Sequence, residues 1–94
     1  MDAGKELKLK ITDSELRGVY ANHIGIMHTK SEFVIDFISM LPPEPIVNSR
    51  VITTPTAIKR IYEAIGLNIK KYEDRFGEII SEETDGGEVN ERVN

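Results

Sequence analysis

Residues 54–77 read TPTAIKRIYEAIGLNIKKYEDRFG, and this stretch has the signature of a long helix. Thr54 is a suitable N-cap, and Pro55 fits the first helical position, where its missing N–H has no partner to lose. Large apolar residues then recur at spacings of three and four and form a narrow stripe: Ile58, Ile61, Ile65, Ile69, Tyr72 and Phe76. Gly77 suits the left-handed conformation that closes many helices. The sequence therefore predicts an amphipathic helix over 55–76, about 33 Å long.

The side of this helix opposite the stripe is charged. Leu67 is the one large apolar residue on it, which makes Leu67 a candidate for contact with another protein. The charged residues on this side are Arg60, Glu63, Lys70, Lys71 and Asp74.

The region before the helix predicts strands. Residues 5–12 alternate apolar and polar side chains, the period of two that is typical of a half-exposed strand, and their lysines suit a sheet edge. The stretches 18–28 and 46–53 are rich in β-branched and other apolar residues and are two further strand candidates. Residues 13–15 predict a turn between the first two strands.

Residues 32–41 form the most apolar stretch, and their pattern fits two structures. As a helix, Thr29 and Glu32 would form a capping box, and Phe33, Phe37 and Leu41 would recur every four residues. As a strand, the β-branched and aromatic residues would fit well, and this reading is preferred. Three prolines within residues 42–45 end the element in either case.

Together these elements predict an α+β fold, with an antiparallel sheet of about four strands followed by one long C-terminal amphipathic helix. We expect a single domain over residues 1–80. Residues 81–94 are polar, acidic and rich in glycine, and we expect them to form a disordered tail.

Composition excludes several classes of protein. The 94 residues include no cysteine, so disulfides and thiolate metal sites are excluded. From Glu78 onward six acids face one base, whereas the preceding residues hold ten acids and eleven bases. A nearly neutral body disfavours nucleic acid as a partner. Because no stretch has the length of a membrane span or the pattern of a signal peptide, we expect a cytoplasmic protein.

Four segments carry a resemblance to a known family. They read Tyr20-Ala21-Asn22, Glu32-Phe33-Val34-Ile35-Asp36-Phe37, Arg50-Val51-Ile52-Thr53-Thr54-Pro55 and Asn68-Ile69-Lys70-Lys71-Tyr72-Glu73-Asp74-Arg75-Phe76-Gly77. Over about residues 17–80 the chain resembles the uncharacterised prokaryotic family catalogued as domain of unknown function 3467. That resemblance implies no activity and no catalytic residue. The predicted order of strands and helix is also similar to SecB-type export chaperones, which is a likeness of architecture alone.

Asp36 is the most suggestive single residue, because it is a carboxylate within an apolar segment. It could serve as a general base with a raised pKa, but no nucleophile or second carboxylate accompanies it. Buried carboxylates are usually paired, and Arg50 on the following strand is the expected partner. We therefore expect Asp36 and Arg50 to form a structural ion pair.

Other polar residues predict no site. His23 and His28 lie five residues apart, so on a regular strand they point to opposite faces and cannot share one metal ion. Asn22 and Asn68 could contact a ligand together, although capping of backbone groups is the commoner role. Thr54 stands at the start of a helix, where free N–H groups can bind an anion. Because no glycine-rich loop precedes this helix, the segment is not a nucleotide-binding motif. We expect no catalytic residue, no cofactor and no metal.

If residues 32–41 form a strand, both of its faces are apolar, and a single helix can cover one of them. The other face would be a larger apolar patch than monomers usually expose. We therefore expect a homodimer or a higher homo-oligomer. The residues expected at such an interface are Ile24, Ile26, Val34, Ile38, Met40 and, on the helix, Leu67.

The function expected from these features is that of a non-enzymatic, oligomeric protein-binding module with adaptor or chaperone-like character. The alternative is a nucleic-acid-associated regulator that uses the basic residues of the helix, which are Lys59, Arg60, Lys70, Lys71 and Arg75. Binding of that kind would weaken steeply as the salt concentration rises.

Overall fold

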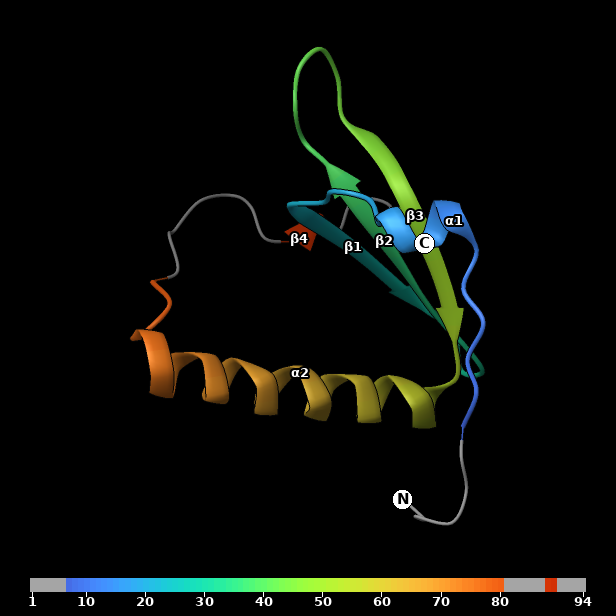
Figure 1. Cartoon of the computed structure of the whole chain (residues 1–94). Helices are drawn as coiled ribbons and strands as arrows, with labels where there is room; N and C mark the ends of the chain where they lie inside the picture. Colours follow the sequence, from blue (N-terminus) through green and yellow to red (C-terminus); the bar gives the residue numbers. More distant parts are fainter. Residues whose placement is uncertain (1–6, 81–87, 90–94) are drawn as a thin grey trace.

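The computed structural model describes residues 7–80 and 88–89 of the chain (Figure 1). Its elements are α1 (Asp13–Arg17), β1 (His23–His28), β2 (Phe33–Ser39), β3 (Ile46–Thr53), α2 (Pro55–Phe76) and β4 (Glu88–Val89). The predicted α+β class, with an antiparallel sheet followed by a long helix, is confirmed.

The sheet has the strand order β3-β2-β1-β4, with β2 in the middle of an antiparallel meander. β4 pairs with β1 in parallel through its two residues. A β-bulge lies between Phe37 and Ile38 of β2, where Asn48 of β3 is passed over in the pairing. The bulge shifts the register of β2 against β3 within the strands themselves.

The stretch 32–41 is a strand, so the preferred reading of its pattern is confirmed. The potential capping box is nevertheless used, but in a turn: Thr29 Oγ1 accepts hydrogen bonds from the N–H groups of Ser31 and Glu32, at 3.2 and 3.1 Å. The N–H of Thr29 also donates to the carbonyl of Glu32 at 2.9 Å. The same hydroxyl that could begin a helix therefore closes the β1–β2 hairpin.

Helix α2 has the bounds and the caps that its sequence predicts. Thr54 is extended, and its Oγ1 accepts a hydrogen bond from the N–H of Ala57 at 3.1 Å. At the other end Gly77 has a φ of 101°, and its N–H donates to the carbonyl of Glu73 at 3.0 Å. A residue with a Cβ would be strained at this φ, which is why the glycine ends the helix here.

The first predicted strand is wrong for residues 7–12, which pair with no strand among the described residues and are exposed. Residues 13–15, predicted as a turn, begin the short helix α1, and Thr12 caps it by accepting from the N–H of Glu15 at 3.3 Å. The second strand begins at His23 rather than at Gly18, whose φ of 76° is left-handed. Alternation reports which side chains share a face, but it does not supply a neighbouring strand.

The expected disorder of residues 81–94 lies outside the described residues, apart from Glu88 and Val89. The expected boundary of the domain at residue 80 therefore stays a prediction.

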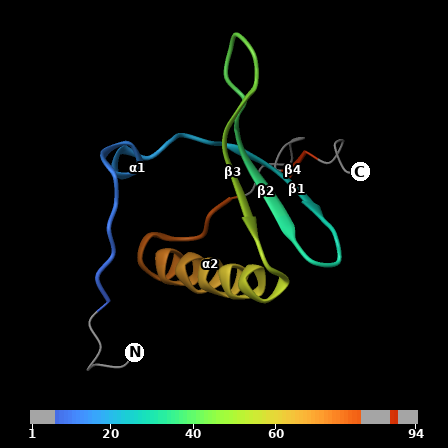
Figure 2. The ribbon, with the colours of Figure 1, turned by 90° about the vertical axis from the view of Figure 1, so that its right-hand side faces the viewer.

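Helix α2 lies below the sheet in two perpendicular views, joined to β3 through Thr54, and the β2–β3 connection points away from it (Figures 1 and 2). None of its 22 residues is buried. In the described part of the chain the buried apolar side chains are Ile35 and Ile38, both on β2. The sequence led us to expect that the helix covers one face of the sheet, whereas it packs closely against neither.

The cap at Thr54 gives a direct test of how α2 begins. Thr54→Ala removes the hydroxyl that satisfies the N–H of Ala57, and we expect it to lower the free energy of unfolding by about 1 kcal/mol. Denaturant unfolding at a fixed protein concentration measures the change. Thr56→Ala is the matched control inside the helix and should cost nothing, because alanine has the higher helix propensity. Equal effects of the two substitutions would contradict the capping role.

Candidate functional site

Asp36 and Arg50 face each other on neighbouring strands, because the register pairs them directly. Arg50 Nε donates to Asp36 Oδ1 at 2.7 Å, and one terminal guanidinium nitrogen donates to Oδ2 at 2.9 Å. The Asp36 side chain is 1% exposed, whereas that of Arg50 is 52% exposed. The two residues therefore form a bidentate ion pair in which Asp36 is buried and Arg50 reaches the solvent.

This pairing raises the pKa of Arg50 above its ordinary value. The hydrogen bond to the Asp36 carboxylate is the largest cause, the charge attraction to it is the second, and burial acts in the opposite direction. A raised pKa in the folded state stabilises the fold while the guanidinium is protonated, and the contribution is lost only above that pKa. The positive charge of Arg50, and its contribution to the pair, therefore stay constant through the physiological range of pH.

The geometry gives Asp36 a structural use. Both of its oxygens accept from Arg50, and Gly25 of β1, its neighbour on the other side, is buried beside it. A carboxylate held in this way by a cation is unsuited to act as a general base. The cation stabilises the ionised form and so weakens the tendency of the carboxylate to accept a proton. The structure brings the two sequence-predicted residues together as a tie between β2 and β3.

A second polar cluster holds the start of β1 and was only partly visible in the sequence. Asn22 Oδ1 accepts from the N–H of Met40 at 2.9 Å, and the N–H of Asn22 donates to the carbonyl of Ile38 at 2.9 Å. Asn48 Nδ2 donates to the carbonyl of Tyr20 at 2.7 Å. Asn48, the residue passed over at the bulge, could not be identified from the sequence, because a bulge leaves no signal in the period of a strand.

Asn22 lies just before β1 and Asn68 on α2, and their hydrogen bonds go to separate partners, so the two asparagines do not form one hydrogen-bonded site. Asn68 Nδ2 donates to the carbonyl of Ala64, one helical turn earlier, at 2.9 Å. The two histidines lie at opposite ends of β1 and, from the register, on opposite faces of the sheet. His28 stacks on Phe33 with ring centroids 5.3 Å apart. Residues 7–80 contain no group of three acidic or histidine side chains that could hold a metal ion.

The register divides the apolar residues of the sheet between two faces. The Phe face carries Phe33, Ile35 and Phe37 of β2 together with Ile24 and Ile26 of β1. The Asp face carries Val34, Asp36 and Ile38 of β2 together with Arg50 of β3.

This division corrects the expectation that Ile24 and Ile26 share a face with Val34 and Ile38. The sequence alone could not fix the pairing of β1 with β2, and a shift by one residue exchanges the faces. Ile38 is buried within its own chain, and Ile24, Ile26 and Val34 are half-buried. Met40, beyond the end of β2, is exposed.

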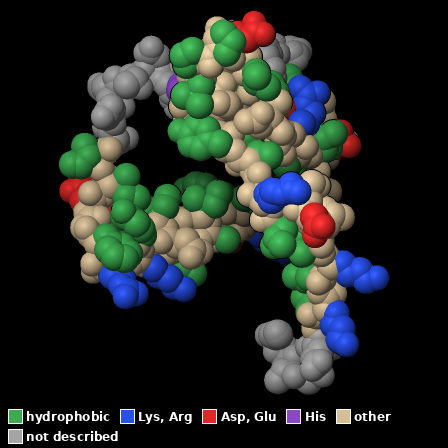
Figure 3. Space-filling model, turned by 45° about the horizontal axis from the view of Figure 1, so that its top comes forward, with side chains coloured by type: hydrophobic (Ala, Val, Ile, Leu, Met, Phe, Trp, Pro, Cys, Tyr) green, Lys and Arg blue, Asp and Glu red, His purple; other side chains and the backbone are tan. Residues whose placement is uncertain are grey.

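A continuous uncovered apolar surface lies instead on α2. Its stripe residues Ile61, Ile65, Ile69, Tyr72 and Phe76 are between 37% and 65% exposed. Figure 3 shows hydrophobic side chains of the helix along an open space that separates it from the sheet. Leu67, on the other side of the helix, is 55% exposed.

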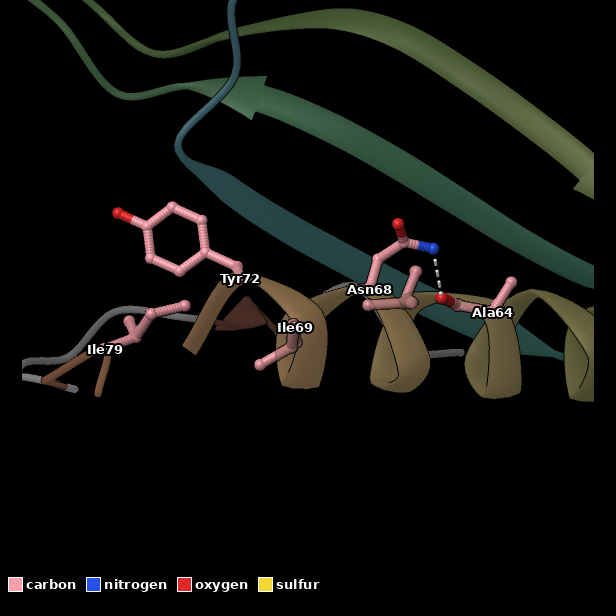
Figure 4. A pocket seen from close by; sticks show the side chains of 6 residues that line it. Ala64, Asn68, Ile69, Tyr72 and Ile79 are labelled. Atoms are coloured by element: carbon pink, nitrogen blue, oxygen red, sulfur yellow. Dashed lines mark hydrogen bonds between the residues drawn. The ribbon is translucent and has the colours of Figure 1, made fainter. Parts of the chain in front are cut away.

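A shallow groove of about 460 Å³ runs along this stripe (Figure 4). Its lining is almost entirely apolar: Ala64, Ile65, Asn68, Ile69, Tyr72 and Ile79. Ile79 is brought to the end of the groove by its N–H, which donates to the carboxylate of Glu73 at 2.9 Å. A surface of this kind can bind an apolar partner.

Within the described residues, no helix combines the length and the apolar character that crossing a membrane requires.

Comparison with known proteins gives one match. The family model described as protein of unknown function (DUF3467) matches residues 1–81 of the 94. Neither the curated proteins nor the solved structures give a match.

The two ion pairs of the described chain allow a matched test of burial. Asp36→Asn weakens two hydrogen bonds to a charged group inside the sheet, and we expect it to lower the free energy of unfolding by about 2 kcal/mol. Asp74→Asn makes the same change in the exposed pair with Lys70, whose atoms are 3.4 Å apart, and should cost less than about 0.5 kcal/mol. Denaturant unfolding of both variants measures the difference. Similar losses would show that the Asp36–Arg50 pair contributes no more than a surface pair.

Proposed function

The chain belongs to the DUF3467 family of proteins of unknown function, and we propose that it is a non-enzymatic, homo-oligomeric protein-binding module. The observation that carries this proposal is the uncovered apolar stripe of α2. A helix with such a stripe is stable in water when the stripe is packed against another surface. Here its own sheet does not provide that surface.

The interior of one copy is too small to explain a stable fold. Among the described residues two apolar side chains are fully buried, Ile35 and Ile38, and this is far fewer than the contiguous core of a typical domain contains. The described residues instead leave an excess of large apolar side chains exposed, among them Ile65, Ile69 and Tyr72 of α2. Association between copies would remove part of this excess.

Further apolar residues support a role in binding. Leu7, Leu9 and Ile11 alternate along the exposed segment before α1, and Leu67 stands on the charged side of α2. A self-associated protein that keeps such residues accessible could hold apolar segments of another protein, which is the adaptor or chaperone-like part of the proposal. The absence of cysteine fits a reducing compartment such as the cytoplasm.

The polar groups of the described chain support a non-enzymatic role. Asp36 is held by Arg50, and Asn22 and Asn48 hydrogen-bond to backbone groups that position β1. These groups are used to build the sheet.

A second candidate function is binding of nucleic acid by the charged side of α2. The helix carries five bases and three acids, which gives it a net charge of +2. The bases are Lys59, Arg60, Lys70, Lys71 and Arg75, and Lys70 is paired with Asp74. This weak positive charge is why nucleic acid ranks second.

The oligomeric state is the first test of the proposal. We expect light scattering at micromolar concentration to give a mass at least twice the 10.6 kDa of one chain. We also expect the midpoint of thermal unfolding to rise with protein concentration, because association stabilises the folded state by mass action. A monomer whose unfolding midpoint does not depend on concentration would contradict the proposal.

The same protein separates the two functions. If α2 binds nucleic acid, the chain will shift labelled RNA or DNA at low salt, and the affinity will fall steeply between 50 and 200 mM salt. If it is a protein-binding module, no shift will occur, whereas a co-purifying protein should be lost in the Leu67→Glu variant. Unchanged binding of that protein by Leu67→Glu would remove the charged side of α2 from the partner surface.

A further inference from the structure

The apolar stripe of α2 is nearly symmetric about its midpoint, residue 67. Ile58 and Phe76 each lie nine residues from this point, and Ile65 and Ile69 each lie two residues from it. Ile61 lies six residues before it, and Tyr72 lies five residues after it. When two such helices lie side by side in antiparallel orientation, the stripe residues of one helix lie opposite the stripe residues of the other.

We propose that the α2 helices of two copies pack against each other in antiparallel orientation, stripe to stripe, about a two-fold axis near residue 67. In this arrangement Ile58 lies opposite the partner's Phe76, Ile61 opposite the partner's Tyr72, and Ile65 opposite the partner's Ile69. The contact is isologous, since the same patch is used on both copies, and it closes without leaving a free surface of the same kind.

The area of the stripe is of the size that a stable dimer needs. With about 200 Å² for a fully exposed residue of this size, the exposed fractions correspond to on the order of 500 Å² of stripe per copy. Exposed Tyr62 and Ile79 border the stripe and extend it toward the ~800 Å² per partner of a standard interface. Only the full length of the stripe, counted with these bordering residues, approaches the area of a standard interface.

Large and smaller residues complement each other in this register. The aromatic residues Tyr72 and Phe76 are confined to the C-terminal half of the stripe, and the N-terminal half carries isoleucines. An antiparallel pair places each aromatic ring opposite an isoleucine, whereas a parallel pair would place each ring opposite its own copy. Alternation of large and small residues across a contact favours dense packing.

The polar groups near the stripe do not oppose burial. Asn68 borders the stripe, and its Nδ2 already donates to the carbonyl of Ala64 at 2.9 Å. The stripe itself carries no charged residue. Antiparallel helices also place the positive end of one helix dipole beside the negative end of the other, which is favourable.

This inference rests on the proposed function, because it names the surface through which the copies associate. The groove along Ala64, Ile65, Ile69 and Tyr72 is then the seat of the partner's helix. Leu67, on the opposite side of α2, stays accessible for a different protein.

A pair of matched substitutions tests the interface. Ile65→Glu places a charge in the centre of the stripe, and we expect it to weaken self-association by at least about 100-fold, since a charge would be buried there without a partner. Leu67→Glu places the same charge on the opposite side of the helix and should leave the mass unchanged. Light scattering gives the mass of each variant, and circular dichroism confirms that the helix is retained.

Spin labels test the orientation of the helices. The chain has no cysteine, so single labels can be placed at Gly66→Cys, where a Cβ meets no atom within 4 Å, and at Thr56→Cys. For the antiparallel pair the two Gly66→Cys labels lie about 3 Å apart along the axis, and the two Thr56→Cys labels about 33 Å apart. Short distances at both positions would indicate parallel helices and overturn the inference.

The outcomes separate the inference from the proposed function. A wild-type protein that is monomeric contradicts both. An oligomer that persists in Ile65→Glu at the wild-type concentration dependence overturns the helix pair and leaves the protein-binding module standing. An oligomer that dissociates in Ile65→Glu but not in Leu67→Glu, with the two label distances as expected, supports both.

Discussion

The structure depends on one constraint: a single copy buries very little apolar surface within itself. Among the described residues the fully buried apolar side chains are Ile35 and Ile38, both on the middle strand of the meander. We propose that contacts between copies supply part of the stability of the chain, and that the surfaces which form these contacts are the places to seek its function.

Polar interactions determine how the three strands of the meander are held together. The Asp36–Arg50 pair joins β2 to β3, and Asn22 and Asn48 attach the start of β1 to the ends of its neighbours. These bonds specify the register of the meander without requiring a large core, since each satisfies a particular donor or acceptor. The sheet can in this way have a defined register even though few of its described side chains are fully buried.

The position of α2 also follows from the small amount of apolar burial within the described chain. Thr54 and Gly77 define the ends of the helix by local hydrogen bonds, so the helix can form beside the sheet without packing closely on it. Its stripe is then available to a second copy, and its charged side, with Leu67, is available to other molecules. Self-association and recognition would use opposite sides of one helix, which keeps the two functions independent.

Much of this could be predicted from the sequence, because some features are local. The bounds and caps of α2 depend on residues within one turn of each end, and the strand at 33–39 follows from its β-branched and aromatic residues. The pairing of Asp36 with Arg50 was also foreseeable, since a carboxylate in an apolar strand needs a nearby cation. Tertiary structure alone decided the unpaired state of residues 7–12, the bulge at Asn48, the faces of Ile24 and Ile26, and the separation of α2 from the sheet. These features depend on which segments meet in space, and the period of a sequence reports the faces of an element but not the neighbour that covers them.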